Sequence, residues 1–137
     1  MAIKITFLGA GSSVFVRNVL GDCIIHPELE DLTFALYDID AQRLEDSYLM
    51  LHAICAHYGK SVKMEKYVGV EELPQALTGA NFLICAIQVG GYDPCTISDF
   101  EIPKKYGLRQ TIADTLGVGG VFRALRTIPV MEMCGKI

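Results

Sequence analysis

Two glycines follow an apolar run near the start of the chain, in the stretch ITFLGAGSSVF. Gly9 permits a sharp turn, and Gly11 lets backbone N–H groups approach a pyrophosphate with no Cβ in the way. Ser12 and Ser13 add hydroxyl donors or cap the helix that follows. These residue types at this spacing predict a phosphate-binding turn, and they are also typical of a plain turn between a strand and a helix.

A carboxylate stands at the end of the second apolar run, DLTFALYDID. Asp38 there can accept hydrogen bonds from both hydroxyls of an adenosine ribose, and it disfavours a ribose that carries a 2′-phosphate. It lies further from Gly11 than the ~20 residues of the usual dinucleotide fingerprint, because the polar insertion HPELED precedes the run. The third small residue of the fingerprint is replaced by Val14. The glycine turn together with the Asp38 carboxylate favours NAD over NADP.

A third group of residues, in AIQVGGYDP, ends the fourth apolar run. Ligands of open α/β sheets bind at the carboxyl ends of the strands. Gln88 and the two following glycines are therefore expected at the same sheet edge, where glycines either make room for a nicotinamide ribose or only shape a loop.

The pattern of apolar residues that must position these groups alternates between strands and helices. Such alternation predicts an α/β fold, a Rossmann-like, doubly wound parallel sheet covered by helices on both faces. The expected strands are residues 2–8, 32–37, 61–69 and 81–89, and the expected helices are 13–25, 41–58, a short one within 70–79, 96–107 and 121–134. Four strands are fewer than the usual six, so the sheet is expected to be incomplete, with an exposed edge that promotes self-association.

The composition sets further bounds. The 137 residues fit one domain, and a net charge of −4 without a run of Lys or Arg excludes a nucleic-acid surface. No apolar run approaches the ~20 residues of a membrane-spanning helix. Five widely spaced cysteines predict reduced thiols and hence a cytoplasmic protein.

Four longer stretches resemble the amino-terminal part of glycoside hydrolase family 4, with the α-galactosidase branch as the nearest match. They are KITFLGAGSSVFVRNVLGD, ALYDIDAQRLE, IQVGGYDPCTISDFEIPKKYGLRQTIADTLGVGG and RALRTIPV. The resemblance covers essentially residues 1–137, which would form the NAD-binding, Rossmann-like domain of a longer glycosidase. It implies a fold like that of lactate and malate dehydrogenases.

The resemblance also implies an activity. Family members hydrolyse O-glycosyl bonds by NAD-assisted oxidation at C3 of the sugar, elimination and addition of water, and they use Mn²⁺. The expected substrate is an unphosphorylated α-galactoside or α-glucoside, since branches acting on 6-phosphorylated sugars often have an Arg where this chain has Gln88. Family relatives are often dimers or tetramers, so a homo-oligomer is expected.

By position, the resemblance assigns cofactor-binding and substrate-binding residues. The cofactor residues are Gly9, Gly11, Ser12, Ser13, Asp38, Gln88 and Val89, with the last two near the nicotinamide, and Asp114 is expected to contact sugar hydroxyls. The family's metal ligands and catalytic base are expected beyond residue 137, so no catalytic or metal-binding residue is assigned here and the chain alone should be inactive. A non-catalytic NAD-binding module and a dehydrogenase of the lactate/malate type remain as alternatives.

Overall fold

The computed structural model describes residues 3–111 and 117–137 and divides the chain into two units. The first, here called the sheet unit, comprises Met1–Ala86 together with Ile137. The second, here called the helical unit, comprises Ile87–Lys136.

The sheet unit alternates strands and helices, as the sequence predicts. Its elements are β1 (Ile3–Leu8), α1 (Ser13–Ile25), β2 (Leu32–Asp38), α2 (Ala41–Tyr58), β3 (Lys63–Val68), a short 3₁₀ turn (Val70–Glu72), α3 (Leu73–Leu77) and β4 (Phe82–Cys85). All strand pairs are parallel, in the order β3-β2-β1-β4. The predicted parallel α/β sheet is therefore confirmed, and its four strands leave it incomplete.

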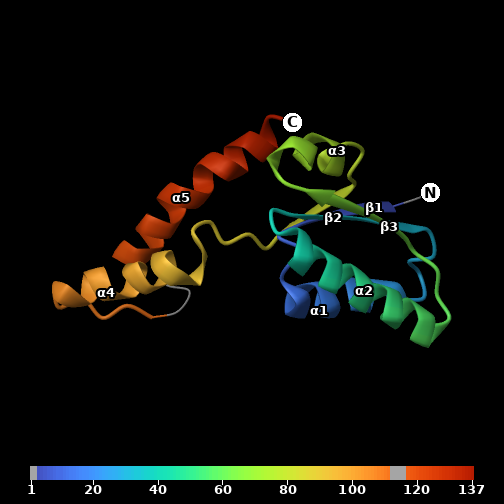
Figure 1. Cartoon of the computed structure of the whole chain (residues 1–137), viewed down its shortest axis with the longest axis horizontal. Helices are drawn as coiled ribbons and strands as arrows, with labels where there is room; N and C mark the ends of the chain where they lie inside the picture. The colour runs from blue at the N-terminus through green and yellow to red at the C-terminus, as the bar shows by residue number, and fades with distance from the viewer. Residues whose placement is uncertain (1–2, 112–116) are drawn as a thin grey trace. The chain divides into compact units, whose positions relative to one another are not determined.

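Helices cover both faces of this sheet. In Figure 1, α1 and α2 lie against one face and α3 against the other. Phe7 and Phe34, from the two central strands, are completely buried beside Leu20 of α1 and Leu51 of α2. The apolar central strands and the apolar stripes of the helices thus form one core, which holds the ends of β1 and β2 in place.

The helix boundaries follow from local chemistry. Asp40 caps α2, since its Oδ1 accepts hydrogen bonds from the backbone N–H groups of Gln42 and Arg43 at 3.0 and 3.1 Å. Gly59 ends the helix in the left-handed conformation, with φ of 61°, which glycine adopts without a steric penalty. The cap matters for the site because it places the start of α2 directly after β2.

The fourth strand is shorter than predicted. The sequence predicts a strand over residues 81–89, whereas β4 ends at Cys85. Its neighbour β1 ends at Leu8, which is in register with Cys85, and Gly9 then turns away with φ of 85°. After a last hydrogen bond from Ala86 N to Leu8 O at 2.8 Å, the chain has no strand left to pair with. The apolar pattern alone could not show this, because it does not reveal where the partner strand stops.

The outer edge of β4 is exposed. Among the described residues, no strand pairs with β4 on the side away from β1. Phe82 is 60% exposed and Leu83 is 44% exposed, although the sequence of β4 is wholly apolar. An apolar strand with free backbone N–H and C=O groups is a template for pairing with another chain.

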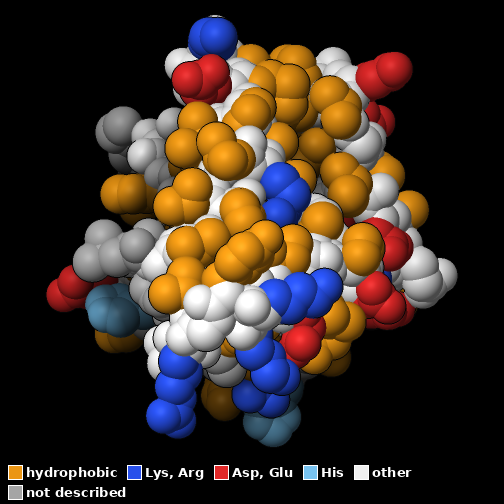
Figure 2. Space-filling model, turned by 90° about the vertical axis from the view of Figure 1, so that its left-hand side faces the viewer, with side chains coloured by type: hydrophobic (Ala, Val, Ile, Leu, Met, Phe, Trp, Pro, Cys, Tyr) orange, Lys and Arg blue, Asp and Glu red, His pale blue; other side chains and the backbone are white. Residues whose placement is uncertain are grey.

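The helical unit contains a π-type turn (Gly91–Thr96) that leads into α4 (Ile97–Lys105), followed by α5 (Val118–Gly135). The two helices predicted around 96–107 and 121–134 are thereby confirmed. Hydrophobic side chains gather on the face that Figure 2 presents. Among the residues of α5, Leu125 and Ile128 are exposed. None of the described helices is both long enough and apolar enough to cross a membrane.

We expect the chain to self-associate through the edge of β4, and Leu83→Lys to reduce this association. A lysine on an edge strand opposes pairing, because its charge would have to be desolvated between the strands. Sedimentation velocity over a concentration series measures the effect. Leu49→Lys is the matched control, since Leu49 is an exposed leucine of α2, away from the edge. A wild-type chain that stays monomeric throughout the series, or equal effects of the two lysines, would contradict this expectation.

Candidate functional site

The turn between β1 and α1 is anchored to the end of β2. The backbone N–H groups of Gly9 and Ala10 both donate to the carbonyl oxygen of Tyr37 at 2.9 Å. Ser12 N closes the turn on Gly9 O at 3.0 Å. Gly9 has φ of 85°, in the left-handed region that favours glycine, so the sharp turn predicted from the sequence is present.

Asp38 links this turn to the next element of the chain. Its Oδ2 accepts the backbone N–H of Gly11 at 2.6 Å, and its Oδ1 accepts that of Asp40 at 3.0 Å. A carboxylate has about four lone-pair positions, and these two bonds leave others for further donors. The structure therefore brings together the glycine turn and the carboxylate that the sequence analysis singled out, and the half-buried carboxylate can still accept hydroxyl donors.

Gly11 lies too close to its neighbours for any other residue. A Cβ on Gly11 would lie 2.8 Å from Asp38 Oδ2 and 2.9 Å from Arg43 Cβ. Real Cβ atoms do not come this close to other heavy atoms, so a larger residue would push the carboxylate or the start of α2 aside.

The first turn of α1 offers unused donors. Ser12 occupies the N-cap position, but its hydroxyl makes no capping hydrogen bond, and Ser13 is exposed. The first turn of α1 contains no acidic residue. An anion at this helix terminus would meet the positive end of the helix dipole, N–H groups and two hydroxyls, with no acidic side chain in that turn.

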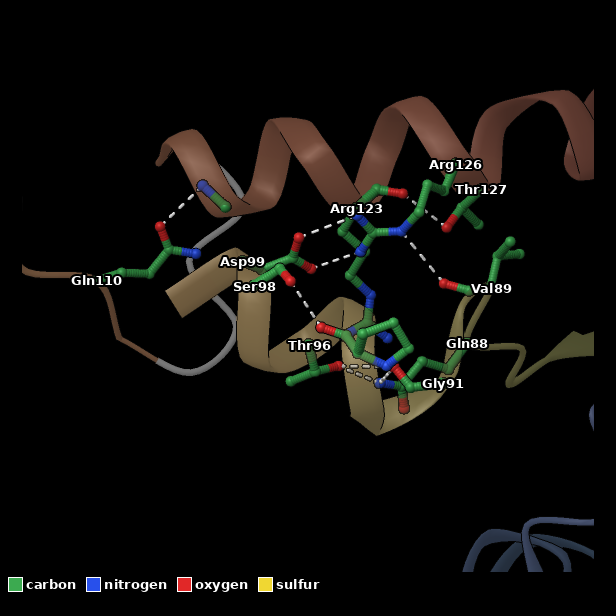
Figure 3. Close-up of polar contacts among 12 residues, drawn as sticks. Gln88, Val89, Gly91, Thr96, Ser98, Asp99, Gln110, Arg123, Arg126 and Thr127 are labelled. Carbon is green, nitrogen blue, oxygen red and sulfur yellow. Dashed lines mark hydrogen bonds and ion pairs between the residues drawn. The ribbon is translucent and has the colours of Figure 1, made fainter. Parts of the chain in front are cut away.

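Gln88 and Val89 belong to the helical unit, in the loop that precedes the π-type turn. The Gln88 side-chain Nε2 donates to Gly91 O at 3.3 Å and to Thr96 Oγ1 at 2.5 Å (Figure 3). The Val89 carbonyl oxygen accepts from Arg126 Nε at 3.3 Å. Both residues of the predicted nicotinamide side therefore have partners that fix them within their own unit.

Arg126 and Asp99 form an ion pair between α5 and α4 that the sequence analysis missed. Arg126 Nη1 and Nη2 bond to Asp99 Oδ1 and Oδ2 at 3.0 and 2.5 Å, and Asp99 is only 5% exposed (Figure 3). The hydrogen bonds that Arg126 donates to the Asp99 carboxylate raise the pKa of the guanidinium above its usual value. In the sequence, Asp99 and Arg126 stand out only because they lie in the family motifs SDFEIP and RALRTIPV. Membership of a motif does not show that the two side chains contact each other.

Two further glycines hold the helical unit together. Gly90 has φ of 91°, and a Cβ there would collide with the Cys95 side chain. In the first turn of α5, the backbone N–H of Gly119 donates to Gln110 Oε1 at 2.8 Å, and a Cβ on Gly119 would collide with the Gln110 side chain. These close contacts place α4, α5 and the Gln88 loop in one defined arrangement.

The described residues do not fit a manganese site. Among residues 3–111 and 117–137, no three His, Cys, Asp or Glu side chains converge as metal ligands would. The three histidines, at positions 26, 52 and 57, are all exposed. Asp114, the predicted sugar ligand, lies outside the described residues, so its role stays a prediction.

None of the five cysteines forms a disulfide within the part of the chain that the structure describes. Burial raises the pKa of the Cys23 and Cys55 thiols, and the charge of Asp22 adds to the effect at Cys23. Both thiols therefore stay protonated and unreactive near neutral pH.

Comparison with known proteins identifies relatives over the whole chain. A sequence model described as "Family 4 glycosyl hydrolase" matches residues 4–137. An alpha-galactosidase of Bacillus subtilis is 57% identical over 96% of this chain, which corresponds to 32% of that protein. An alpha-galacturonidase of Thermoanaerobacter italicus is 34% identical over 98% of this chain and 28% of that protein. The chain thus spans about a third of the length of these relatives.

Solved structures have the same fold. A 6-phospho-alpha-glucosidase from gut microorganisms, in complex with NAD and glucose-6-phosphate, aligns with a TM-score of 0.80 at 25% identity. The alignment covers 97% of this chain and 29% of that glucosidase chain. A 6-phospho-beta glucosidase of Thermotoga maritima, with manganese, NAD+ and glucose-6-phosphate, aligns with a TM-score of 0.77 at 26% identity, over 98% of this chain and 31% of that one.

We expect Gly11→Ala to disrupt the turn, because its Cβ must displace either the Asp38 carboxylate or the start of α2. The free energy of unfolding should fall by about 1–3 kcal/mol, as in other overpacked sites. Urea denaturation measures it. The control is Gly21→Ala in α1, where the nearest atom would be an ordinary 3.8 Å away and helix propensity predicts a gain of up to about 1 kcal/mol. Equal stabilities of the two variants would show that the turn is not as tightly packed as described.

Proposed function

Because the chain belongs to family 4 of the glycosyl hydrolases, we propose that it is the NAD-binding, amino-terminal portion of a glycosidase. The proposed substrate is an unphosphorylated α-galactoside, with an α-glucoside as the alternative. The 57% identical alpha-galactosidase supports the galactoside, whereas the alpha-galacturonidase described above is only 34% identical.

The observation that carries the NAD-binding proposal is the hydrogen bond between the Gly11 backbone N–H and the Asp38 carboxylate. The 2.6 Å hydrogen bond holds the carboxylate next to the turn that leads into α1, so a ribose at Asp38 and a pyrophosphate at the start of α1 could be bound side by side. In this proposal Asp38 accepts the ribose hydroxyls, while Gly9, Gly11, Ser12 and Ser13 surround the pyrophosphate at the start of α1. NAD⁺, when bound, supplies the hydride acceptor for oxidation of the sugar.

Charge favours NAD over NADP in this arrangement. A 2′-phosphate would lie against the Asp38 carboxylate, and two anions in contact repel each other. Arg43 begins next to the turn, because its Cβ lies 2.9 Å from the Cβ position of Gly11, and a guanidinium could offset part of this repulsion. NADP⁺ is therefore an informative competitor for the test.

The remaining assignments depend on the family. Gln88 and Val89 are proposed for the nicotinamide end, Asp114 for the sugar, and Mn²⁺ for residues that this chain does not supply. We also propose a cytoplasmic, homo-oligomeric parent protein, supported by the absence of disulfides among the described residues and by the exposed edge of β4.

We expect isothermal titration calorimetry to show saturable binding of NAD⁺, weaker binding of NADP⁺, and a loss of about tenfold or more in NAD⁺ affinity for Asp38→Asn. The loss follows from one or two charge-assisted hydrogen bonds, each worth about 1.5–3 kcal/mol. Asp31→Asn is the matched control, since Asp31 is exposed and its substitution changes the net charge by the same amount as Asp38→Asn. Thermal unfolding confirms that each variant is folded. A folded wild-type chain that binds neither nucleotide would contradict the proposed function.

A further inference from the structure

The loop that precedes the π-type turn contains a tight turn of its own. Gly91 N donates to Gln88 O at 3.4 Å, so residues 88–91 form a β-turn with Val89 and Gly90 at its centre. Gly90 has φ of 91° and ψ of −2°, and a β-branched residue such as Val89 disfavours positive φ. This combination is typical of a type II turn, whose third residue is usually glycine.

Arg126 holds the central peptide of this turn in its type II orientation. Its Nε donates to Val89 O at 3.3 Å, while Nη1 and Nη2 are bonded to the buried carboxylate of Asp99 (Figure 3). Turns of types I and II differ by a flip of the central peptide, and the flip would turn Val89 O away from the guanidinium. All these groups belong to the helical unit, so the orientation of the peptide does not depend on the sheet unit.

The orientation of the central peptide decides which of its groups is left for a ligand. The peptide between Val89 and Gly90 is trans, so its N–H points away from its carbonyl oxygen and hence away from Arg126. Gly90 is exposed, and within the described part of the chain its N–H has no acceptor. The turn therefore presents a backbone donor to a ligand, whereas a flipped turn would present an acceptor.

We propose that Arg126, held by Asp99, is a positioning residue that keeps the Gly90 N–H directed at the nicotinamide riboside half of NAD⁺. The inference rests on the proposed function, which takes Gln88 and Val89 to lie at the nicotinamide end. A fixed backbone N–H can donate to the carboxamide oxygen or to a ribose hydroxyl oxygen, and it orders no side chain when it does so. The adenosine and the pyrophosphate are assigned to the sheet unit, so their binding should not depend on Arg126.

The donor is tested first by NMR of the ¹⁵N-labelled wild-type chain. Before any ligand is added, the Arg126 Nε–H should exchange with water more slowly than that of Arg123, an exposed arginine of the same helix. NAD⁺ should then shift the Gly90 amide signal, whereas ADP, which lacks nicotinamide riboside, should leave it in place. Equal exchange of the two arginines, equal shifts of Gly90 with both nucleotides, or no shift of Gly90 with bound NAD⁺ would overturn the proposal.

The positioning role is tested with Arg126→Lys. Where Arg has Nε, Lys has a methylene group, so the variant keeps a cation for Asp99 but places a CH₂ group against Val89 O. The affinity for NAD⁺ should fall about fivefold, as expected for one lost hydrogen bond, while the affinity for ADP should not change. Arg123→Lys is the matched control and should leave both affinities unchanged.

Isothermal titration calorimetry measures these affinities, and thermal unfolding shows which variants are folded. An unchanged NAD⁺ affinity in Arg126→Lys, equal losses for NAD⁺ and ADP, or an equal loss for NAD⁺ in the control would overturn the proposal. If Arg126→Lys does not fold, the Gly90 shifts of the wild-type chain decide. A folded wild-type chain that binds neither nucleotide would overturn the proposed function and this inference with it, whereas the other contrary results leave the NAD⁺ site itself intact.

Discussion

The candidate site depends on one hydrogen bond, between the Gly11 backbone N–H and the Asp38 carboxylate. The parallel register pairs Leu8 with Tyr37, so β1 and β2 end at the same edge of the sheet. The carboxylate then joins the turn after β1 to the start of α2, at 2.6 Å from Gly11 N and 3.0 Å from Asp40 N. Since any Cβ on Gly11 would enter this contact, the bond also explains why a glycine is needed there.

A second constraint acts inside the helical unit. Asp99 is almost fully buried, and a buried carboxylate is tolerated only when it is paired, here with both terminal nitrogens of Arg126. Such a pair adds little net stability over apolar residues, although removing one partner costs about 3–5 kcal/mol. Its structural consequence is specific: the third nitrogen of the guanidinium is left to hold the Val89 carbonyl oxygen.

The order and type of the helices and strands could be predicted from the sequence, because apolar residues recur with different periods in buried strands and in amphipathic helices. The sequence predicted β4 to run to residue 89, since the apolar pattern continues there, whereas the strand ends at Cys85 where its neighbour β1 stops. The sequence predicted that the glycine turn and Asp38 would each follow a strand end, but it did not predict the hydrogen bond between Asp38 and Gly11. The sequence also did not predict the pairing of Arg126 with Asp99, because it depends on how α4 packs against α5. Nor did it predict the hydrogen bonds of the Gln88 side chain, which depend on the rotamer of Thr96.

The central claim is that the turn at Gly11 and the Asp38 carboxylate bonded to it bind NAD⁺. Backbone amide NMR tests this claim most directly. In a titration of the ¹⁵N-labelled chain with NAD⁺, the account predicts saturable shifts concentrated at the amides of residues 9–13 and 38–40. The Gly11 amide should show one of the largest, because its hydrogen bond to Asp38 must adjust when the carboxylate accepts the ribose hydroxyls. Saturable shifts confined to other parts of the folded chain, or none at all, would contradict the account.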